Sequence, residues 1–219
     1  LFKFAAVSTL VAATLVLSGV GNRAAADSTY GNIDKVLGSA VVGSGEHYGN
    51  VSLVNGSVKI ASNSSAKTVS LVNGGIKMSD DVSVDSAETV NGSIVAGRNL
   101  TVNGSVTTVN GEIVVKDNAR IAGDVMTVNG DISFDSAQIA QNISTVNGDI
   151  SLAGNTVVKG DVVFKKAGKK KSFFGWGNNN QPSLNIAANV VIEGLIILEQ
   201  PVVLDFANPA LQAKVVERF

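Results

Sequence analysis

The chain has 219 residues, of which 45% are apolar, 5% aromatic and 16% charged, and it contains no cysteine. Without cysteine we expect no disulfide bond, no thiolate zinc site, no cysteine nucleophile and no lipid anchor on an N-terminal cysteine. The net charge of −1 at pH 7 argues against a nucleic-acid partner, which would require an excess of basic residues. The low aromatic content favours a narrow core of small branched side chains.

Residues 1–26 have the pattern of a secretory signal peptide. Lys3 precedes an apolar run over residues 4–17, and the three alanines at 24–26 fit an Ala-x-Ala cleavage site. The apolar run is shorter than the ~20 residues of a membrane-spanning helix, which favours cleavage over an uncleaved anchor. We therefore expect a mature chain that begins at Asp27, has a net charge of −3 after loss of Lys3 and Arg23, and is periplasmic or secreted.

After a lead-in at residues 27–35, the tripeptide Val-Asn-Gly recurs through residues 36–204. Six copies follow one another at steps of 18 or 19 residues, and a seventh, at Asn103, lies outside this series. Apolar residues two apart, separated by Asn-Gly, predict short strands joined by tight turns. The pattern therefore predicts an all-β, parallel β-helix (a β-solenoid) of about eight coils. The six asparagines of the series are Asn55, Asn73, Asn91, Asn110, Asn129 and Asn147.

The repeat also predicts how its side chains point. We expect the repeat valines to face the core and the asparagines to stack as a structural ladder at a corner, bonding the neighbouring turn backbone. Threonine precedes the tripeptide in four coils, at Thr89, Thr108, Thr127 and Thr145. If they faced outward, these threonines would form a regular hydroxyl array like that of ice-binding solenoids. Leucine at this place in the first two coils favours a role in strand propensity and turn bonding instead.

Residues 165–183 interrupt the repeat as an inserted loop. Gly160 and Gly194 are 34 residues apart, whereas the corresponding glycines of an ordinary long coil are 19 apart. Lysines and aromatic rings together suit an anionic membrane surface, and Trp176 could instead stack on a glycan. A surface loop without a binding role is the third interpretation. The candidate binding residues are Lys165, Lys166, Lys169, Lys170, Lys171, Phe173, Phe174 and Trp176.

Residues 205–219 are predicted to form a short capping helix. Asn208 and Pro209 are a typical N-cap and first helical residue, and Leu211, Val215 and Phe219 recur every four residues as an apolar stripe. Such a helix would cover the strand edges of the last coil. Residues 30–48 show no comparable cap, and an uncapped end would permit end-to-end association.

Candidate catalytic or metal-binding residues are few. His47 is the only histidine, so no histidine pair exists for a metal. Acidic residues directly after the repeat glycine are ordinary turn residues, and a second acidic group lacks the Gly-rich nonapeptide of calcium-binding β-rolls. We therefore expect no catalytic residue, no cofactor and no metal. The two acidic groups are Glu112, Asp131 and Asp149, and Asp80, Asp81 and Asp85.

Three segments carry a resemblance to a known family. Ile-Ala-Gly-Asp-Val at 121–125, Val-Lys-Gly-Asp-Val at 158–162 and Val-Asn-Gly-Ser-Val at 102–106 resemble the Gly-Asp-Val repeats of bactofilins, the polymer-forming bacterial cytoskeletal proteins. The Thr-Val-Asn-Gly-Asp-Ile repeats at Thr127 and Thr145 are also similar to uncharacterised β-solenoid domains of bacterial envelope proteins. The bactofilin resemblance implies a right-handed β-helix that polymerises end to end without nucleotide. Neither resemblance implies catalytic residues.

The sequence thus favours a non-enzymatic scaffold with a structural or binding role at the cell envelope. Its expected partners are further copies of the chain, bound through the solenoid ends, and an anionic membrane surface or an envelope glycan. The alternative is a carbohydrate-binding or carbohydrate-active β-helix, which a cleft of carboxylates on one face would favour.

Overall fold

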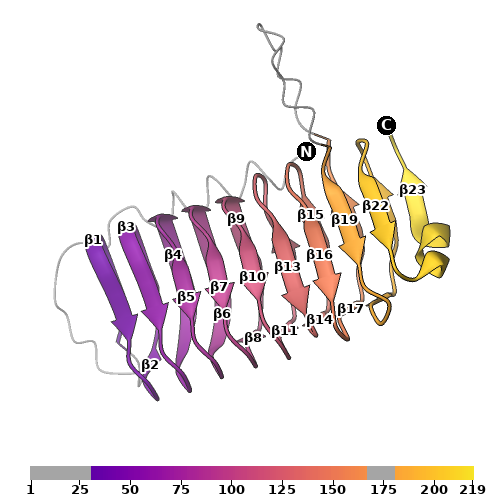
Figure 1. The fold of residues 1–219 in the computed structure, drawn as a ribbon. Coiled ribbons are helices and arrows are strands. Elements are labelled where there is room, and N and C mark those ends of the chain that lie inside the picture. The colour runs from indigo at the N-terminus through magenta and orange to yellow at the C-terminus, as the bar shows by residue number, and fades with distance from the viewer. Residues whose placement is uncertain (1–30, 167–180) are drawn as a thin grey trace, which may run out of the picture.

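The computed structural model describes residues 31–166 and 181–219, which form a parallel β-solenoid of about ten coils, about 18 residues apart (Figure 1). The predicted signal peptide and most of the predicted binding loop lie outside the described residues. The predicted coil length is confirmed. About ten coils replace the expected eight because pairing already begins at Ile33 and extends beyond residue 200, through β22 and β23.

Each coil contributes strands to three faces, which we name A, B and C. Four long N-terminal strands each run over two faces: β1 (Ile33–Val42) and β3 (Val51–Ile60) over C and A, β4 (Ser65–Asn73) and β6 (Ser83–Asn91) over B and C. Face A continues with β5 (Ile76–Met78), β7 (Ile94–Ala96), β10 (Ile113–Val115), β13 (Ile132–Asp135), β16 (Ile150–Ala153), β19 (Ser183–Ile186) and β22 (Val203–Phe206). Face B also contains β2 (His47–Tyr48), β8 (Thr101–Val102), β11 (Arg120–Ile121), β14 (Gln138–Ile139), β17 (Val157–Val158) and β20 (Val191–Ile192). Face C continues with β9 (Val106–Asn110), β12 (Val125–Met126), β15 (Ile143–Thr145), β18 (Val162–Phe164), β21 (Ile196–Leu198) and β23 (Val215–Glu217).

The core is a set of straight columns, because the register between coils equals the repeat length. On face A, Val58 pairs with Ile76, Ile76 with Ile94 and Ile94 with Ile113, and all four are buried. Stacked positions therefore keep the same chemistry from coil to coil. Branched aliphatic side chains fill most of the interior, as the low aromatic content predicts.

The prediction that the repeat valines face the core is wrong for most of them. The residue before each valine points inward: Leu53, Leu71 and Thr89 are fully buried, whereas Val54, Val72 and Val90 are half-buried on the outside. Strand alternation is regular up to the corner, so the inward residues on face C lie two apart, for example Val51 and Leu53. The alternation is interrupted at the corner itself, since the next buried residue is Val58.

The four threonines accordingly lie inside the solenoid, each fully buried. Thr89, Thr108 and Thr127 donate a hydrogen bond from Oγ1 to a glycine carbonyl of the preceding coil, over 3.3, 2.9 and 3.2 Å. The threonines therefore form no outward hydroxyl array. Their predicted role in bonding the turn is confirmed, with a backbone carbonyl as the acceptor.

Glycine is required at the Asn-Gly corner for two reasons. Gly56 and Gly74 have φ of +148° and +131°, a region that side chains with a Cβ rarely adopt. A Cβ on Gly74 would also lie 1.6 Å from the carbonyl oxygen of Gly56, one coil earlier. The corners therefore stack glycine on glycine, and this sets the tight, constant register of the whole rod.

The C-terminal segment differs from the predicted helix. Asn208 caps a 3-10 helix, η1 (Pro209–Lys214), with Pro209 at its start, and Leu211 is buried beneath it. The helix ends there, because Val215–Glu217 pairs in parallel with β21 as β23. The predicted apolar stripe is thus not formed: Leu211 lies on a helix, Val215 on a strand, and Phe219 is exposed.

Candidate functional site

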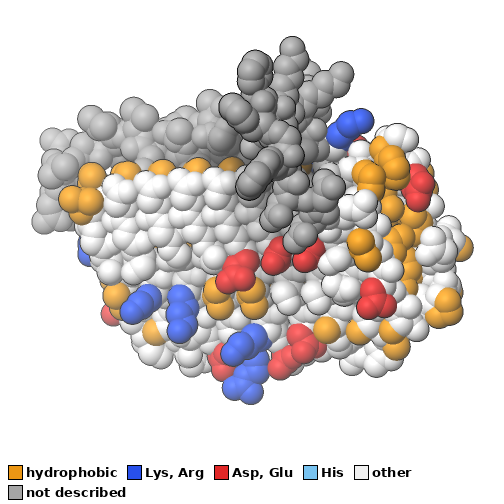
Figure 2. Space-filling model, turned by 45° about the horizontal axis from the view of Figure 1, so that its top comes forward, with side chains coloured by type: hydrophobic (Ala, Val, Ile, Leu, Met, Phe, Trp, Pro, Cys, Tyr) orange, Lys and Arg blue, Asp and Glu red, His pale blue; other side chains and the backbone are white. Residues whose placement is uncertain are grey.

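Exposed apolar side chains gather at the two ends of the solenoid. Within the described residues, every large apolar side chain that is exposed belongs to the first coil or the last two coils. Leu37 is the most open of them, with 73% of its surface accessible. Figure 2 shows apolar side chains gathered over the last coils, whereas charged side chains are scattered along the rod. The set is Val36, Leu37, Val41, Val191, Leu195, Val203 and Phe219.

The same ends present unpaired strand edges. β1 pairs with β3 alone, β22 with β19 alone and β23 with β21 alone, as far as the described residues show. Each terminal strand therefore has one edge of backbone N–H and C=O groups without a neighbouring strand, the type of edge that pairs with another chain. At the C-terminal end η1 covers part of the last coil, whereas no helix covers β1 within the described residues.

A comparison of the coils could have identified the apolar ends from the sequence. Leu37 occupies the position that asparagine holds in the next coil, since it pairs with Asn55. Val41 pairs with Lys59, which in turn pairs with Lys77. Apolar residues thus replace polar ones at outward positions of the first coil, and this signal appears only when the coils are aligned by position.

The predicted asparagine ladder is present, but its bonds run between side chains. Each Nδ2 donates to the Oδ1 of the asparagine one coil earlier, over 2.7–2.8 Å, from Asn147 back to Asn55. The expected hydrogen bonds to the turn backbone are therefore replaced by hydrogen bonds between side-chain amides. Asn103 lies at another corner, where its Nδ2 donates to Asp85 Oδ1 over 2.9 Å.

Two of the three acidic residues after the repeat glycine, Asp131 and Asp149, serve as acceptors for the next coil. Asp131 Oδ1 accepts from the backbone N–H of Asp149 over 2.8 Å, and Asp149 Oδ1 accepts from that of Ser183 over 2.7 Å. One oxygen of each carboxylate is thus engaged in holding the coils together.

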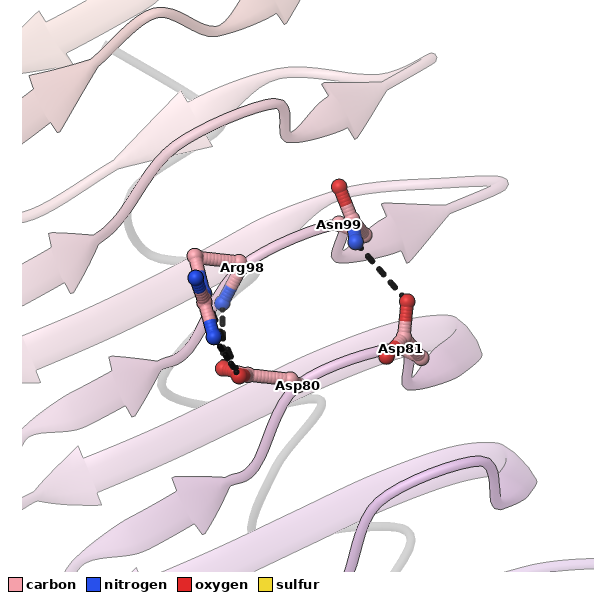
Figure 3. Close-up of polar contacts among 4 residues, drawn as sticks. All are labelled: Asp80, Asp81, Arg98 and Asn99. Atoms are coloured by element: carbon pink, nitrogen blue, oxygen red, sulfur yellow. Dashed lines mark hydrogen bonds and ion pairs between the residues drawn. The ribbon is translucent and has the colours of Figure 1, made fainter.

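The second acidic group is paired in the same manner (Figure 3). Asp80 Oδ1 accepts from the Arg98 backbone N–H at 2.8 Å, while the guanidinium lies 2.9 Å from Oδ2. Because the backbone and side-chain hydrogen bonds from Arg98 favour the charged form, they lower the pKa of the Asp80 carboxyl. Asn99 donates to Asp81 over 2.8 Å. In the described residues, no group of three or more acidic or histidine side chains could hold a metal ion.

His47 lies on the first strand of face B and is exposed. Its Nδ1 is 2.7 Å from the hydroxyl oxygen of Ser65, one coil later, and the two share a hydrogen bond. This contact holds the imidazole against the outer surface of the rod, in the column of face B that continues through Ser65, Ser83 and Thr101.

The base of the inserted loop is anchored on both sides. The register confirms the insertion, since Ile150 pairs with Leu184, 34 residues later. The carbonyl of Lys165 accepts from Gln200 Nε2 over 2.9 Å, and the backbone N–H of Lys166 donates to Glu199 Oε2 over 3.2 Å. The remaining candidate residues of the loop, from Lys169 to Trp176, lie outside the described residues.

A polar hollow of about 300 Å³ lies beside the point where the loop returns. Its walls come from the last Asn-Gly corner of the ladder and from the following coil, and they combine carboxylates with amides. The lining residues are Asp131, Asn147, Gly148, Asp149, Gln181, Pro182 and Gln200.

The described residues contain no membrane-spanning helix, and the comparisons with known proteins gave no match. No helix in residues 31–166 and 181–219 has the length and apolar character needed to cross a membrane. In the comparisons with known proteins, no family model, no characterised protein and no solved structure matched the chain. The resemblance to bactofilins therefore stays a prediction.

Proposed function

We propose that this chain is a non-enzymatic scaffold of the bacterial cell envelope that self-associates through the ends of its solenoid. The gathering of exposed apolar side chains in the first coil and the last two coils carries the proposal. Unpaired strand edges at the same places add backbone hydrogen-bonding groups. An edge that is both apolar and unpaired gains from burial and from ladder extension when a second copy binds.

Light scattering over a range of concentrations tests this proposal. We expect the mass of purified residues 27–219 to grow with concentration. Val41→Lys should weaken the growth, because a lysine at the edge of the first coil opposes strand pairing. Val114→Lys is the matched control, since Val114 occupies the same outward column of face A in the middle of the rod. A monomer at all concentrations, or equal effects of the two variants, would contradict the proposal.

The envelope location rests on residues 1–26. Lys3, the apolar run over 4–17 and the alanines at 24–26 support export and cleavage before Asp27. N-terminal sequencing of the exported protein should therefore begin at Asp27, and retention in the cytoplasm would contradict this part of the proposal.

The inserted loop is the proposed envelope contact. Five lysines and three large aromatic side chains within residues 165–176 match the chemistry of an anionic lipid surface. We expect the purified chain to bind vesicles that contain anionic lipid and to be released by salt. Binding that is equal for neutral and anionic vesicles would contradict the electrostatic part of this role.

Carbohydrate binding is the second candidate function, and the polar hollow favours it. Asp131 and Asp149 line it together with amide side chains, a combination that can hydrogen-bond sugar hydroxyls. Binding of envelope polysaccharide that is lost in Gln200→Ala would support this function.

A further inference from the structure

The chain contains seven Asn-Gly dipeptides, the type of sequence that is most susceptible to deamidation. In that reaction the backbone nitrogen of the glycine attacks Cγ of the asparagine, because glycine has no side chain to hinder the approach. The new N–Cγ bond replaces the Cγ–Nδ2 bond, ammonia leaves with the proton of the glycine N–H, and a succinimide ring remains. Water then opens the ring to aspartate or isoaspartate. For the attack the glycine N–H must leave its acceptor and the asparagine side chain must turn toward it, so each hydrogen bond on either group slows the reaction.

The ladder holds both reacting groups at most of these dipeptides. The N–H groups of Gly74, Gly92, Gly111 and Gly130 each donate to the carbonyl of the repeat asparagine one coil later, over 2.8–2.9 Å. The side chains of the asparagines in these four dipeptides each donate one hydrogen bond from Nδ2 and accept another at Oδ1. At the first dipeptide, Asn55 and Gly56 lie inside β3, which pairs through this corner with β1 and β4.

Asn147 lacks this protection because the loop interrupts the ladder after it. Its Nδ2 donates to Asn129, but within the described residues no group donates to its Oδ1 and no acceptor faces the Gly148 N–H. Asn147 and Gly148 also line the polar hollow, which is large enough to hold the water that opens a succinimide.

Asn103 is the second unprotected case. It stands outside the ladder, is exposed, and makes one side-chain bond, to Asp85. The N–H of Gly104 has no acceptor in the part of the chain that the structure describes.

We propose that Asn103 and Asn147 are the deamidation sites of the folded protein and that the ladder protects the other five Asn-Gly dipeptides. At position 147 the product would lose the donor to Asn129 and place a third carboxylate in the hollow beside Asp131 and Asp149. Deamidation would thus change the charge of the polar hollow at the base of the inserted loop. The inference is independent of self-association.

Peptide mass spectrometry of the full chain, incubated at mildly alkaline pH both folded and in denaturant, tests the proposal. In denaturant all seven asparagines should react at similar rates. In the folded protein Asn103 and Asn147 should react faster than the other five, by roughly tenfold or more. At these two only a side-chain hydrogen bond must open, whereas at the ladder dipeptides the hydrogen bond of the glycine N–H must open as well. Equal protection of all seven, or ladder asparagines as reactive as Asn147, would overturn the proposal.

A loop-replacement variant supplies the matched control. Replacing residues 165–182 by Val-Asn-Gly recreates before Ser183 the Val-Asn-Gly-Ser corner found at residues 90–93. The Nδ2 of the new asparagine would donate a hydrogen bond to Asn147 Oδ1, and its backbone carbonyl would accept one from the Gly148 N–H. Asn147 should then react as slowly as the ladder residues, while Asn103 stays reactive. Continued fast reaction of Asn147 in a folded variant would refute the assigned cause, and the comparison within the wild-type chain decides the proposal if the variant misfolds.

Discussion

The inward position before each Val-Asn-Gly tripeptide accepts either a hydroxyl or an aliphatic side chain. Leu53 and Leu71 fill it in the first two of these coils and threonine in the next four. Phe164 and Leu198 occupy the same column in later coils, which lack the tripeptide. A buried hydroxyl costs free energy unless it finds an acceptor, and three of the threonines find one in a glycine carbonyl. Thr145 Oγ1 is the exception, because it is buried without a hydrogen-bond partner among the described residues.

This difference predicts opposite effects for two identical substitutions. Thr108→Val removes a 2.9 Å bond to Gly92 and should lower the free energy of unfolding by about 1 kcal/mol. Thr145→Val removes an unsatisfied buried hydroxyl and should raise it by about 1 kcal/mol. Urea unfolding midpoints of the two variants measure both effects. A loss of stability in both would mean that Thr145 makes a bond, through water or the loop, that its neighbours in the described chain do not provide.

Glu88 adds a pH dependence at the residue scale. It lies on the outer side of face C between Ser70 and Thr107, and burial raises the pKa of its carboxyl. A folded-state pKa above the unfolded value means that the contribution of Glu88 to stability is present below about pH 4.5 and is lost as pH rises through the folded pKa. Glu88→Gln should therefore stabilise the protein at pH 7 and have no such effect below pH 4. Thermal unfolding of both proteins across this range tests the prediction, and a gain that is equal at all pH values would contradict it.

The side-chain directions show what the sequence could not supply at this scale. The spacing of the asparagines predicts the coil length and the ladder, because both depend on a fixed period. The inward position was missed because threonine there looks polar and valine beside it looks apolar. Hydropathy alone places Val90 inside and Thr89 outside, whereas the bond from Thr89 to the Gly74 carbonyl reverses the order.

At the scale of elements, the Asn-Gly corner is the unit that fixes the register. The glycines of neighbouring coils stack so closely that a Cβ would not fit between them. The hydrogen bonds between the stacked asparagine side chains add one further contact for each coil. A coil can therefore lose its corner to an insertion, as it does after Lys165, only if the strands on both sides keep their pairing. Val162 still pairs with Ile196 and Leu184 with Ile150, so faces A and C continue past the insertion.

Removal of the inserted loop should for this reason leave the solenoid intact. With residues 165–182 replaced by Val-Asn-Gly, we expect the circular dichroism spectrum of the wild type and an equal or higher unfolding temperature, because an ordinary corner restores the ladder. Binding to anionic vesicles should be lost. A folded variant that still binds vesicles as the wild type does would show that the contact lies elsewhere on the rod.

The C-terminal element shows a second limit of sequence reasoning. Asn208 and Pro209 predict where a helix begins, because capping depends on neighbouring residues. Its end was missed because Leu211, Val215 and Phe219 fit a helical period of four. Val215 also lies one coil of 19 residues after Ile196, and this longer period prevails because the open edge of β21 offers backbone bonds that a free helix does not.

At the scale of the whole molecule, the middle and the ends of the rod differ in kind. Coils in the middle have a neighbour on each side, polar corners and a buried core, and within the described residues they expose no large apolar side chain. The first and last coils have one neighbour each and expose apolar side chains. In a solenoid each coil contacts its neighbours alone, so the ends should also open more readily than the middle.

Hydrogen exchange can therefore locate the association as well as detect it. In a dilute solution of residues 27–219, amides of β1 and β22 should exchange faster than those of β7 and β10. As the concentration rises, exchange in β1 and β22 should slow because a second copy covers their free edges, while β7 and β10 should not change. Val41→Lys should keep the exchange of β1 fast at every concentration, and Val114→Lys should behave as the wild type. Mass that grows with concentration without slower exchange at either end would show that the copies meet along the sides of the rod.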